Sequence, residues 1–481
     1  MTKKLFIVES PGKIKKLGTI LGKEYVVAAS VGHVQDLVKK DLGIDVNNNF
    51  KMTYQISSDK KKVVSNLRSL VKSCDEVILA ADEDREGEAI AASLADVLKL
   101  KDPKRVVFNE ITKSALLKAL KNPRKINYNL VRAQETRRAL DRLVGWKLSP
   151  LLWQNVGPKL SAGRVQSVVV KLIIDKEDEI EALNQKAYYK LYGKFNSQSD
   201  KDNKLSATLY EIDKKKTSKT SIKGDILKLN KKKDVDKLLN ILDESNYTIN
   251  LIEDKISKRN SSPPFITSTL QQEASKKFGF NIKSTMSIAQ KLYEKGHITY
   301  MRTDSTSLSE EALKSAAEYI ISKFGKEYYS KKQYASKSKN AQEAHEAIRP
   351  TKLNKSEIEG SREEEKLYSL IWKRTIASQM SAAKIAINNI YIEIVHNKII
   401  PYYFLATNEN IIFEGFLKVY NIKSEDDEEL LKSNTNFKKG DKLDYYEIES
   451  KEEYSKSIGR YNEANLVKKL EDLGIGRPST Y

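Results

Sequence analysis

Four short apolar runs in the first 110 residues most restrict the folds open to this chain. They lie at 4–8, 25–29, 77–81 and 106–108, and amphipathic helical segments separate them. Runs of this length that alternate with helices are typical of a parallel sheet with crossover helices. In such a sheet, ligands bind beyond the carboxyl ends of the strands. The sequence therefore predicts an N-terminal α/β domain with a site at that edge of the sheet.

Acidic residues stand at this predicted edge. Glu9 ends the first run, and Asp82, Asp84 and Glu86 follow the third. Carboxylate oxygens suit Mg²⁺, which proteins usually hold with one or two carboxylates plus water and substrate phosphate. The residues alone leave an alternative open, because acids also gather ahead of a helix, here one starting near Glu88, to stabilise its N-terminus. If all four converge, a cation or a substrate must meet them, so they form a candidate Mg²⁺ site.

A second feature is a tyrosine two residues from an arginine, in a run that we expect to be a short strand. Side chains at i and i+2 of a strand share a face, so Tyr300 and Arg302 would face one phosphate. Tyrosine has a pKa of about 10 and attacks only where a cation or a base stabilises the phenolate. The chain has 24 tyrosines, and residue type alone favours a packing role for any one of them.

Composition points to a polyanionic partner. The chain has 85 Lys and Arg against 65 Asp and Glu, and this net charge of +20 is spread along its length. The alternative is the lysine-rich composition of a low-GC genome. One cysteine, Cys74, excludes disulfides and any multi-cysteine zinc site within these residues. Residues 10–14 lack the first glycine and the hydroxyl of a Walker phosphate loop, so no ATP is expected to drive a reaction.

The sequence has neither an apolar leader after Met1 nor a long apolar run. We therefore expect a soluble, cytoplasmic protein with no membrane partner.

Segment 297–305, HITYMRTDS, resembles the active-site segment of the type IA DNA topoisomerases, in particular the bacterial topoisomerase I group. Five further blocks agree with that family in the same order. They are FIVESPGK at 6–13, DEDREGE at 82–88, LSAGRVQS at 160–167, AHEAIRPT at 344–351 and GIGRPSTY at 474–481.

The resemblance implies an ATP-independent enzyme that cleaves one DNA strand through a 5′-phosphotyrosine. It would then pass a strand, religate the break and relax negatively supercoiled DNA. A single chain would act on a single-stranded region, in a bacterial cytoplasm at the nucleoid. Two alternatives stay open: an Mg²⁺-dependent nuclease of the Toprim type, which does not need Tyr300, and a single-stranded DNA-binding protein without catalysis.

The resemblance also implies roles for individual residues. Catalytic roles fall to Tyr300, Arg302, Glu9, Lys13 and His345, with Lys13 as a cation at the scissile phosphate. The implied metal ligands are Glu9, Asp82, Asp84 and Glu86. The implied DNA contacts are His33, Arg138, Arg142, Lys147, Gln154, Ser161, Ala162, Gly163, Arg164, Val165, Gln166 and Arg302.

Pattern and resemblance together predict a multidomain α/β plus α+β protein whose chain runs out and back, which suits a ring. The expected parts are a Mg²⁺-binding Toprim domain at 1–122, a helical DNA-binding domain at 123–186 and 451–481, a β-rich arch at 187–260 and 381–450, and a helical domain with the tyrosine at 261–380. We expect Pro150 to end the helix that starts near residue 127. Because the sequence stops at Tyr481 inside a family motif, we expect part of the family's C-terminal region to be missing, and cleavage even where relaxation is lost.

Overall fold

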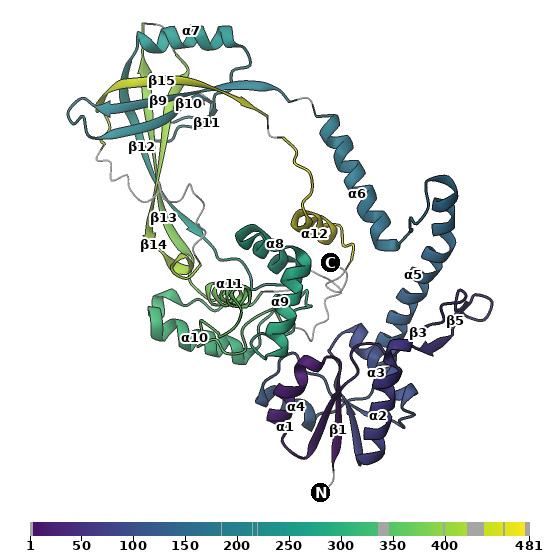
Figure 1. Cartoon of the computed structure of the whole chain (residues 1–481). Coiled ribbons are helices and arrows are strands. Elements are labelled where there is room, and N and C mark those ends of the chain that lie inside the picture. Colours follow the sequence, from purple (N-terminus) through teal and green to yellow (C-terminus); the bar gives the residue numbers. More distant parts are fainter. Residues whose placement is uncertain are drawn as a thin grey trace.

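The computed structural model describes residues 3–183, 185–213, 215–218, 220–334, 346–397, 400–420, 437–455 and 457–476. Its elements follow one another around a ring (Figure 1), as the out-and-back order predicts. The N-terminal α/β part lies at the bottom of this view, and a β-rich part lies at the top. Among the helices of the described ranges, none has the length and apolar content needed to cross a membrane.

The N-terminal part is a four-stranded parallel sheet in the order β2-β1-β7-β8, which confirms the predicted architecture. Along β1, Leu5 and Ile7 pack into one core while Phe6 and Val8 pack into another, so both faces of the sheet are buried. The strands are β1 (Lys4–Val8), β2 (Tyr25–Ala29), β7 (Glu76–Leu79) and β8 (Lys104–Arg105). The helices are η1 (Pro11–Lys13), α1 (Ile14–Leu21), η2 (Ser58–Lys60), α2 (Lys61–Ser73), α3 (Arg85–Val97) and α4 (Lys113–Lys121).

Two small antiparallel pairs extend from this domain. They are β3 (Gln35–Leu37) with β6 (Tyr54–Ile56), and β4 (Ile44–Asp45) with β5 (Lys51–Met52).

Two long helices, α5 (Tyr128–Asn155) and α6 (Arg164–Glu181), lead away from the N-terminal part (Figure 1). The expectation that α5 ends at Pro150 is wrong, since the helix continues through it. A proline removes only one helical hydrogen bond, and Ser149 Oγ accepts a bond from the Ala162 N–H that holds this turn against the α5–α6 connection. None of the residues of α6 is buried, and apolar side chains such as Val170 and Ile174 are exposed.

The β-rich part is an antiparallel sheet in the order β11-β10-β14-β13-β12-β15-β9, and a further pairing of β10 with β9 closes six of its strands into a barrel. The strands are β9 (Ala187–Ser197), β10 (Lys204–Ile212), β11 (Gly224–Ile226), β12 (Asn246–Arg259), β13 (Ala383–Val395), β14 (Tyr402–Phe413) and β15 (Lys442–Tyr454). Helix α7 (Lys232–Asp243) was not predicted, because it is a single short helix between segments with strand-like alternation. Its Leu238 and Leu242 pack into the barrel core.

Strands β12 and β13 pair along their length and connect the barrel to a second helical part (Figure 1). Its helices are α8 (Thr267–Phe278), α9 (Ile282–Glu294), α10 (Glu310–Phe324), η3 (Lys326–Tyr328) and α11 (Arg362–Ser378). The 3-10 helix η4 (Gly415–Lys418) follows β14, and α12 (Glu463–Asp472) follows β15. Helix α12 packs on α8, where Ser268 Oγ donates to Glu471 Oε2 at 2.7 Å. One hydrophobic cluster runs from Phe6 of the N-terminal sheet to Phe265 and Tyr368, so the N-terminal and second helical parts share a core.

Candidate active site

Tyr300 lies in an irregular segment between α9 and α10, so the expected strand is wrong. Backbone hydrogen bonds to two other segments hold this one in place. The Tyr300 N–H donates to the Asn109 carbonyl at 2.7 Å, and the Thr299 N–H donates to the Arg349 carbonyl at 2.9 Å. Asn109 belongs to the N-terminal part and Arg349 to the segment before α11, so the tyrosine backbone is fixed at the junction of these parts.

The Tyr300 side chain points across this junction. It is 6% exposed, and its hydroxyl donates to Asp84 Oδ2 at 2.6 Å. Arg302 Nη1 lies 3.8 Å from the same carboxylate oxygen. The phenol and the guanidinium therefore converge on one anionic group, as the sequence predicts, although that group is a carboxylate here.

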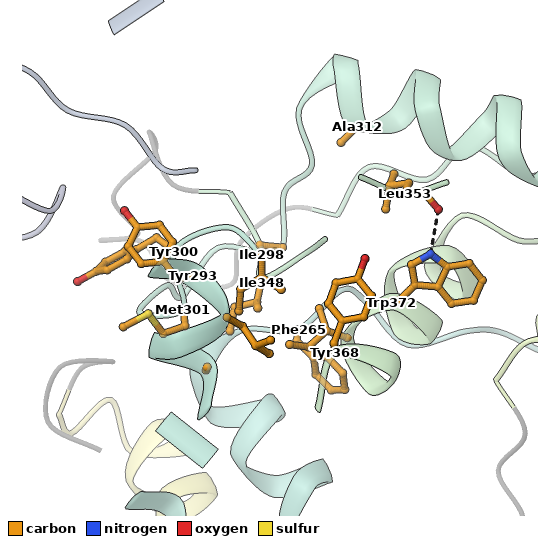
Figure 2. Packing of buried hydrophobic residues seen from close by; sticks show 14 of the residues in the cluster. Phe265, Tyr293, Ile298, Tyr300, Met301, Ala312, Ile348, Leu353, Tyr368 and Trp372 are labelled. Atoms are coloured by element: carbon orange, nitrogen blue, oxygen red, sulfur yellow. Dashed lines mark hydrogen bonds between the residues drawn. The ribbon is translucent and has the colours of Figure 1, made fainter. Parts of the chain in front are cut away.

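Beside them lies a fully buried lysine. Lys13 is the last residue of η1 and the N-cap of α1, and its ammonium forms an ion pair with Asp82. Tyr293 of α9 donates its hydroxyl to Asp82 Oδ1 at 3.3 Å. Figure 2 shows Tyr293 and Tyr300 next to each other at the edge of the buried cluster, with both hydroxyls directed away from the other labelled residues. Their ring centroids are 5.3 Å apart.

Electrostatics set the protonation of this group. Burial, followed by repulsion from Asp82, raises the pKa of Glu9 from 4.5 to about 7. Burial and the Asp84 carboxylate raise the pKa of Tyr300 well above its usual value, while Arg302 opposes this shift. Tyr300 is therefore a neutral phenol in this arrangement, and Glu9 has a proton to give near neutral pH.

The carboxyl oxygens of Glu9, Asp82 and Asp84 are the donors that a divalent cation prefers and could hold one here. Glu86 faces α5 instead. His33 Nε2 lies 3.0 Å and Gln134 Nε2 3.1 Å from its Oε2, and the hydrogen bond from His33 is the main cause of its lowered pKa. Within the described residues, no three His, Cys, Asp or Glu side chains are already grouped as a metal site. A cation would therefore have to displace Lys13 or Tyr300 from the aspartates.

The predicted DNA contacts lie along α5, α6 and their connection, and several already have protein partners. Arg138 pairs with Asp36, Arg142 Nη2 donates to the Val38 carbonyl at 2.6 Å, and Arg164 Nε donates to Asp141 Oδ1 at 2.9 Å.

Arg137 lies 3.8 Å from both Glu86 and Asp141, so a row of charged groups connects the acidic loop to the start of α6.

The rest of the predicted DNA-binding set divides between a turn and exposed positions. Gln166 Nε2 donates to Ser161 Oγ at 3.0 Å, and Gly163 caps α6. Lys147 and Gln154 are exposed on α5, and Ala162 and Val165 are half-buried. His345 lies outside the described residues.

A buried ion-pair group beside Tyr300 was not predicted. Arg349 Nη2 is 2.7 Å from Glu346 Oε2 and 3.1 Å from Glu110 Oε2, and Asn109 Nδ2 donates to Glu346 Oε2 at 2.9 Å. We call Asn109, Glu110, Glu346 and Arg349 the latch, because the first two belong to the N-terminal part and the last two to the tyrosine part. The sequence gives no signal for Asn109, Glu110 or Tyr293 beyond their residue types.

Comparison with known proteins agrees with this arrangement. Residues 4–111 match the Toprim domain model, and residues 125–481 match the DNA topoisomerase model. The chain is 48% identical over 501 residues to the prokaryotic-type DNA topoisomerase 1 of Acanthamoeba polyphaga mimivirus. It belongs to the type IA DNA topoisomerase family. The Toprim fold and the family resemblance are thus confirmed.

Two other relatives extend this family assignment. The chain is 46% identical over 500 residues to DNA topoisomerase 1 of Campylobacter jejuni. Full-length topoisomerase I from Thermotoga maritima has a TM-score of 0.81 and 37% identity, and the match covers 99% of this chain and 76% of that one. The sequence matches cover 99% and 100% of this chain but 58% of the viral and 68% of the Campylobacter relative, so this topoisomerase chain spans part of their length.

Proposed function

We propose that this chain is an ATP-independent type IA topoisomerase that cleaves and religates one DNA strand at Tyr300. The observation that carries the proposal is the placement of the Tyr300 hydroxyl 2.6 Å from Asp84 of the Toprim domain, with Arg302 and Lys13 beside it. A phosphate bound between these groups would meet the nucleophile, two cations and a protonated carboxyl.

The proposed reaction balances within this set of residues. Tyr300 Oη attacks phosphorus and passes its proton to Asp84, the hydrogen-bond acceptor. The bond to the 3′ oxygen breaks, and Glu9 gives that oxygen a proton. Arg302 and Lys13 stabilise the charge on the phosphoryl oxygens. The 5′-phosphotyrosine conserves the energy of the broken bond, so the 3′ hydroxyl can reverse the reaction without ATP.

We further propose that Asp82 and Asp84, with Glu9 as a third ligand when its carboxyl is ionised, would hold Mg²⁺, which would supply neutralising positive charge when bound. The substrate would be a single-stranded region of negatively supercoiled DNA, approached along α5 and α6. The basic composition and the half-exposed Arg164 support this path. The same proposal places the chain, acting as a monomer, at the bacterial nucleoid in the cytoplasm, with no membrane partner.

The test is incubation of the chain with negatively supercoiled plasmid and Mg²⁺ in the absence of ATP. Relaxation is read on a native gel, and protein linked to DNA is measured after denaturation. We expect the adduct in the wild type and none in Tyr300→Phe. Tyr334→Phe is the matched control, because it removes a phenol hydroxyl bonded to the Ser378 carbonyl in the same part of the molecule.

Other outcomes identify the alternatives. An adduct that persists in Tyr300→Phe would contradict the assigned nucleophile. Cleaved DNA without attached protein would favour the Mg²⁺-dependent nuclease, and salt-sensitive binding without any cleavage would favour a binding protein. An adduct without relaxation would mean that the site is complete but strand passage needs more of the relatives' length.

A further inference from the structure

Tyr293 is a buried group that the mechanism above does not use. It lies on α9, seven residues before Tyr300, and its side chain is fully buried. Its hydroxyl donates to Asp82 Oδ1 at 3.3 Å. Its ring is 4.9 Å from Lys13 Nζ and 5.3 Å from the Tyr300 ring. A single side chain of the tyrosine part thus touches a Toprim cation, a Toprim carboxylate and the nucleophile.

The surroundings of Lys13 make this contact unusual. The lysine side chain is 0% exposed, and a buried ammonium is costly unless it is compensated. Among the described residues, its ammonium pairs with Asp82 and lies over the ring of Tyr293. A desolvated cation over an aromatic ring is stabilised by the ring quadrupole. One compensating group therefore comes from the Toprim domain, and the other arrives only when the two parts are closed against each other.

Tyr293 also restrains Asp82 and the nucleophile Tyr300. Because the Tyr293 hydroxyl donates to the same Asp82 oxygen that Lys13 approaches, it fixes the direction of that carboxylate. Its ring meets that of Tyr300 at 63°, an edge-to-face arrangement that restricts the Tyr300 ring. Small displacements of reacting groups lower reaction rates strongly. A residue that fixes the positions of three such groups therefore affects the rate of DNA cleavage.

We propose that Tyr293 is a positioning residue that places Lys13, Asp82 and Tyr300 relative to one another, and does so only in the closed arrangement of the two parts. This inference rests on the proposed function and extends it to the opening of the junction. Opening the junction withdraws Tyr293 from Lys13 and Asp82, which disables cleavage and religation together until closure.

The kinetic test uses a single-stranded oligonucleotide and compares wild type, Tyr293→Phe, Tyr293→Leu and Tyr368→Phe. Tyr368→Phe is the matched control, since Tyr368 is 2% exposed, lies in the same hydrophobic cluster and donates its hydroxyl to the Lys355 carbonyl. We expect adduct formation to fall about tenfold in Tyr293→Phe, which keeps the ring, and about a hundredfold in Tyr293→Leu. Oligonucleotide affinity should match that of Tyr368→Phe in both variants, and the melting temperature should match it in Tyr293→Phe, whereas Tyr293→Leu loses stability to the cavity it leaves.

A double-variant comparison separates positioning from packing. If Tyr293 acts through Lys13 and Asp82, then Tyr293→Phe should slow single-turnover cleavage far less in a Lys13→Ala background than in the wild type. Equal effects in the two backgrounds would overturn the proposal. So would a Tyr293→Phe protein that cleaves as fast as Tyr368→Phe.

A second readout does not depend on DNA cleavage. Acetic anhydride labelling of the DNA-free protein, followed by peptide mass spectrometry, reports the accessibility of the Lys13 amine. We expect Lys13 to be labelled slowly in the wild type, Tyr293→Phe and Tyr368→Phe, and at least about tenfold faster in Tyr293→Leu because the covering ring is lost. Unchanged labelling in Tyr293→Leu would overturn the inference even if the wild type proves inactive on DNA. A wild type that forms no adduct while labelling changes as expected would instead overturn the proposed function.

Discussion

At the residue scale, the chemistry depends on where protons lie among Glu9, Asp84 and Tyr300. The sequence predicted which residues would meet, because each of the three lies in a motif block that resembles the family. It did not predict that Tyr300 would donate to Asp84, since this contact joins residues 216 positions apart. Nor did it predict that Glu86 would face His33 and α5, because alternation along a loop says nothing about the helix that starts at Arg85.

The raised pKa of Glu9 makes folding stability depend on pH. The folded chain holds a proton on Glu9 up to about pH 7, while the unfolded chain loses it near 4.5. Between these values the folded state binds more protons, so stability falls as pH rises through this window. The loss from this group is at most about 3 kcal/mol.

We expect Glu9→Gln to remove this part of the pH dependence. The melting temperature without divalent cations, measured at pH 5 and pH 8, should fall less in the variant than in the wild type. An identical fall in both proteins would mean that Glu9 does not carry the buried proton.

At the element scale, three of the four predicted parallel strands and most of the helices were confirmed, because their hydrophobic periods are strong, while the fourth strand is Lys104–Arg105 and not the predicted 106–108. The misses have local causes. Helix α5 continues through Pro150, and α7 is a short helix between strands with strong alternation. The Tyr300 segment has strand-like residues, yet its N–H groups bond to Asn109 and other loops instead of a sheet. Tertiary partners of this kind leave no trace in a single sequence.

The loop of Asp82 and Asp84 is held by the first turn of α3. Asp84 caps this helix by accepting from the Gly87 N–H at 2.7 Å, and a Cβ on Gly87 would overlap the Asp82 carbonyl. We expect Gly87→Ala to displace the loop, to cost about 2 kcal/mol and to reduce adduct formation strongly.

Gly18→Ala is the matched control for this change. Gly18 lies inside α1 and a Cβ there meets no atom within 4 Å, so it should be neutral or stabilise by up to about 1 kcal/mol. Urea denaturation measures the unfolding free energy of both variants, and the adduct assay measures their cleavage. Equal behaviour of the two variants would contradict the role given to Gly87.

At the scale of the whole molecule, the latch holds the Toprim and tyrosine parts together. Arg349 is 6% exposed and forms ion pairs with both Glu110 and Glu346. Arg349→Met would leave two nearly buried carboxylates without their cation, which should cost about 3–5 kcal/mol.

Glu110→Gln keeps the Arg349–Glu346 pair and should cost far less, so the two variants form a matched set. Thermal unfolding and limited proteolysis at the junction are the measurements. If Glu110→Gln is as damaging as Arg349→Met, then the Toprim side of the latch carries most of its strength.

The paired strands β12 and β13 give the molecule a mechanical property. Tyr247, Ile249 and Ile252 of β12 pack in the barrel core, and the remainder of the strand, 253–259, makes an arm about 23 Å long, so a bend of about 15° where it leaves the barrel would carry its far end about 6 Å. The tyrosine part sits at that far end. The arm is thus a lever, and a small bend near the barrel would be converted into a displacement of several ångströms at the catalytic junction without unfolding either part.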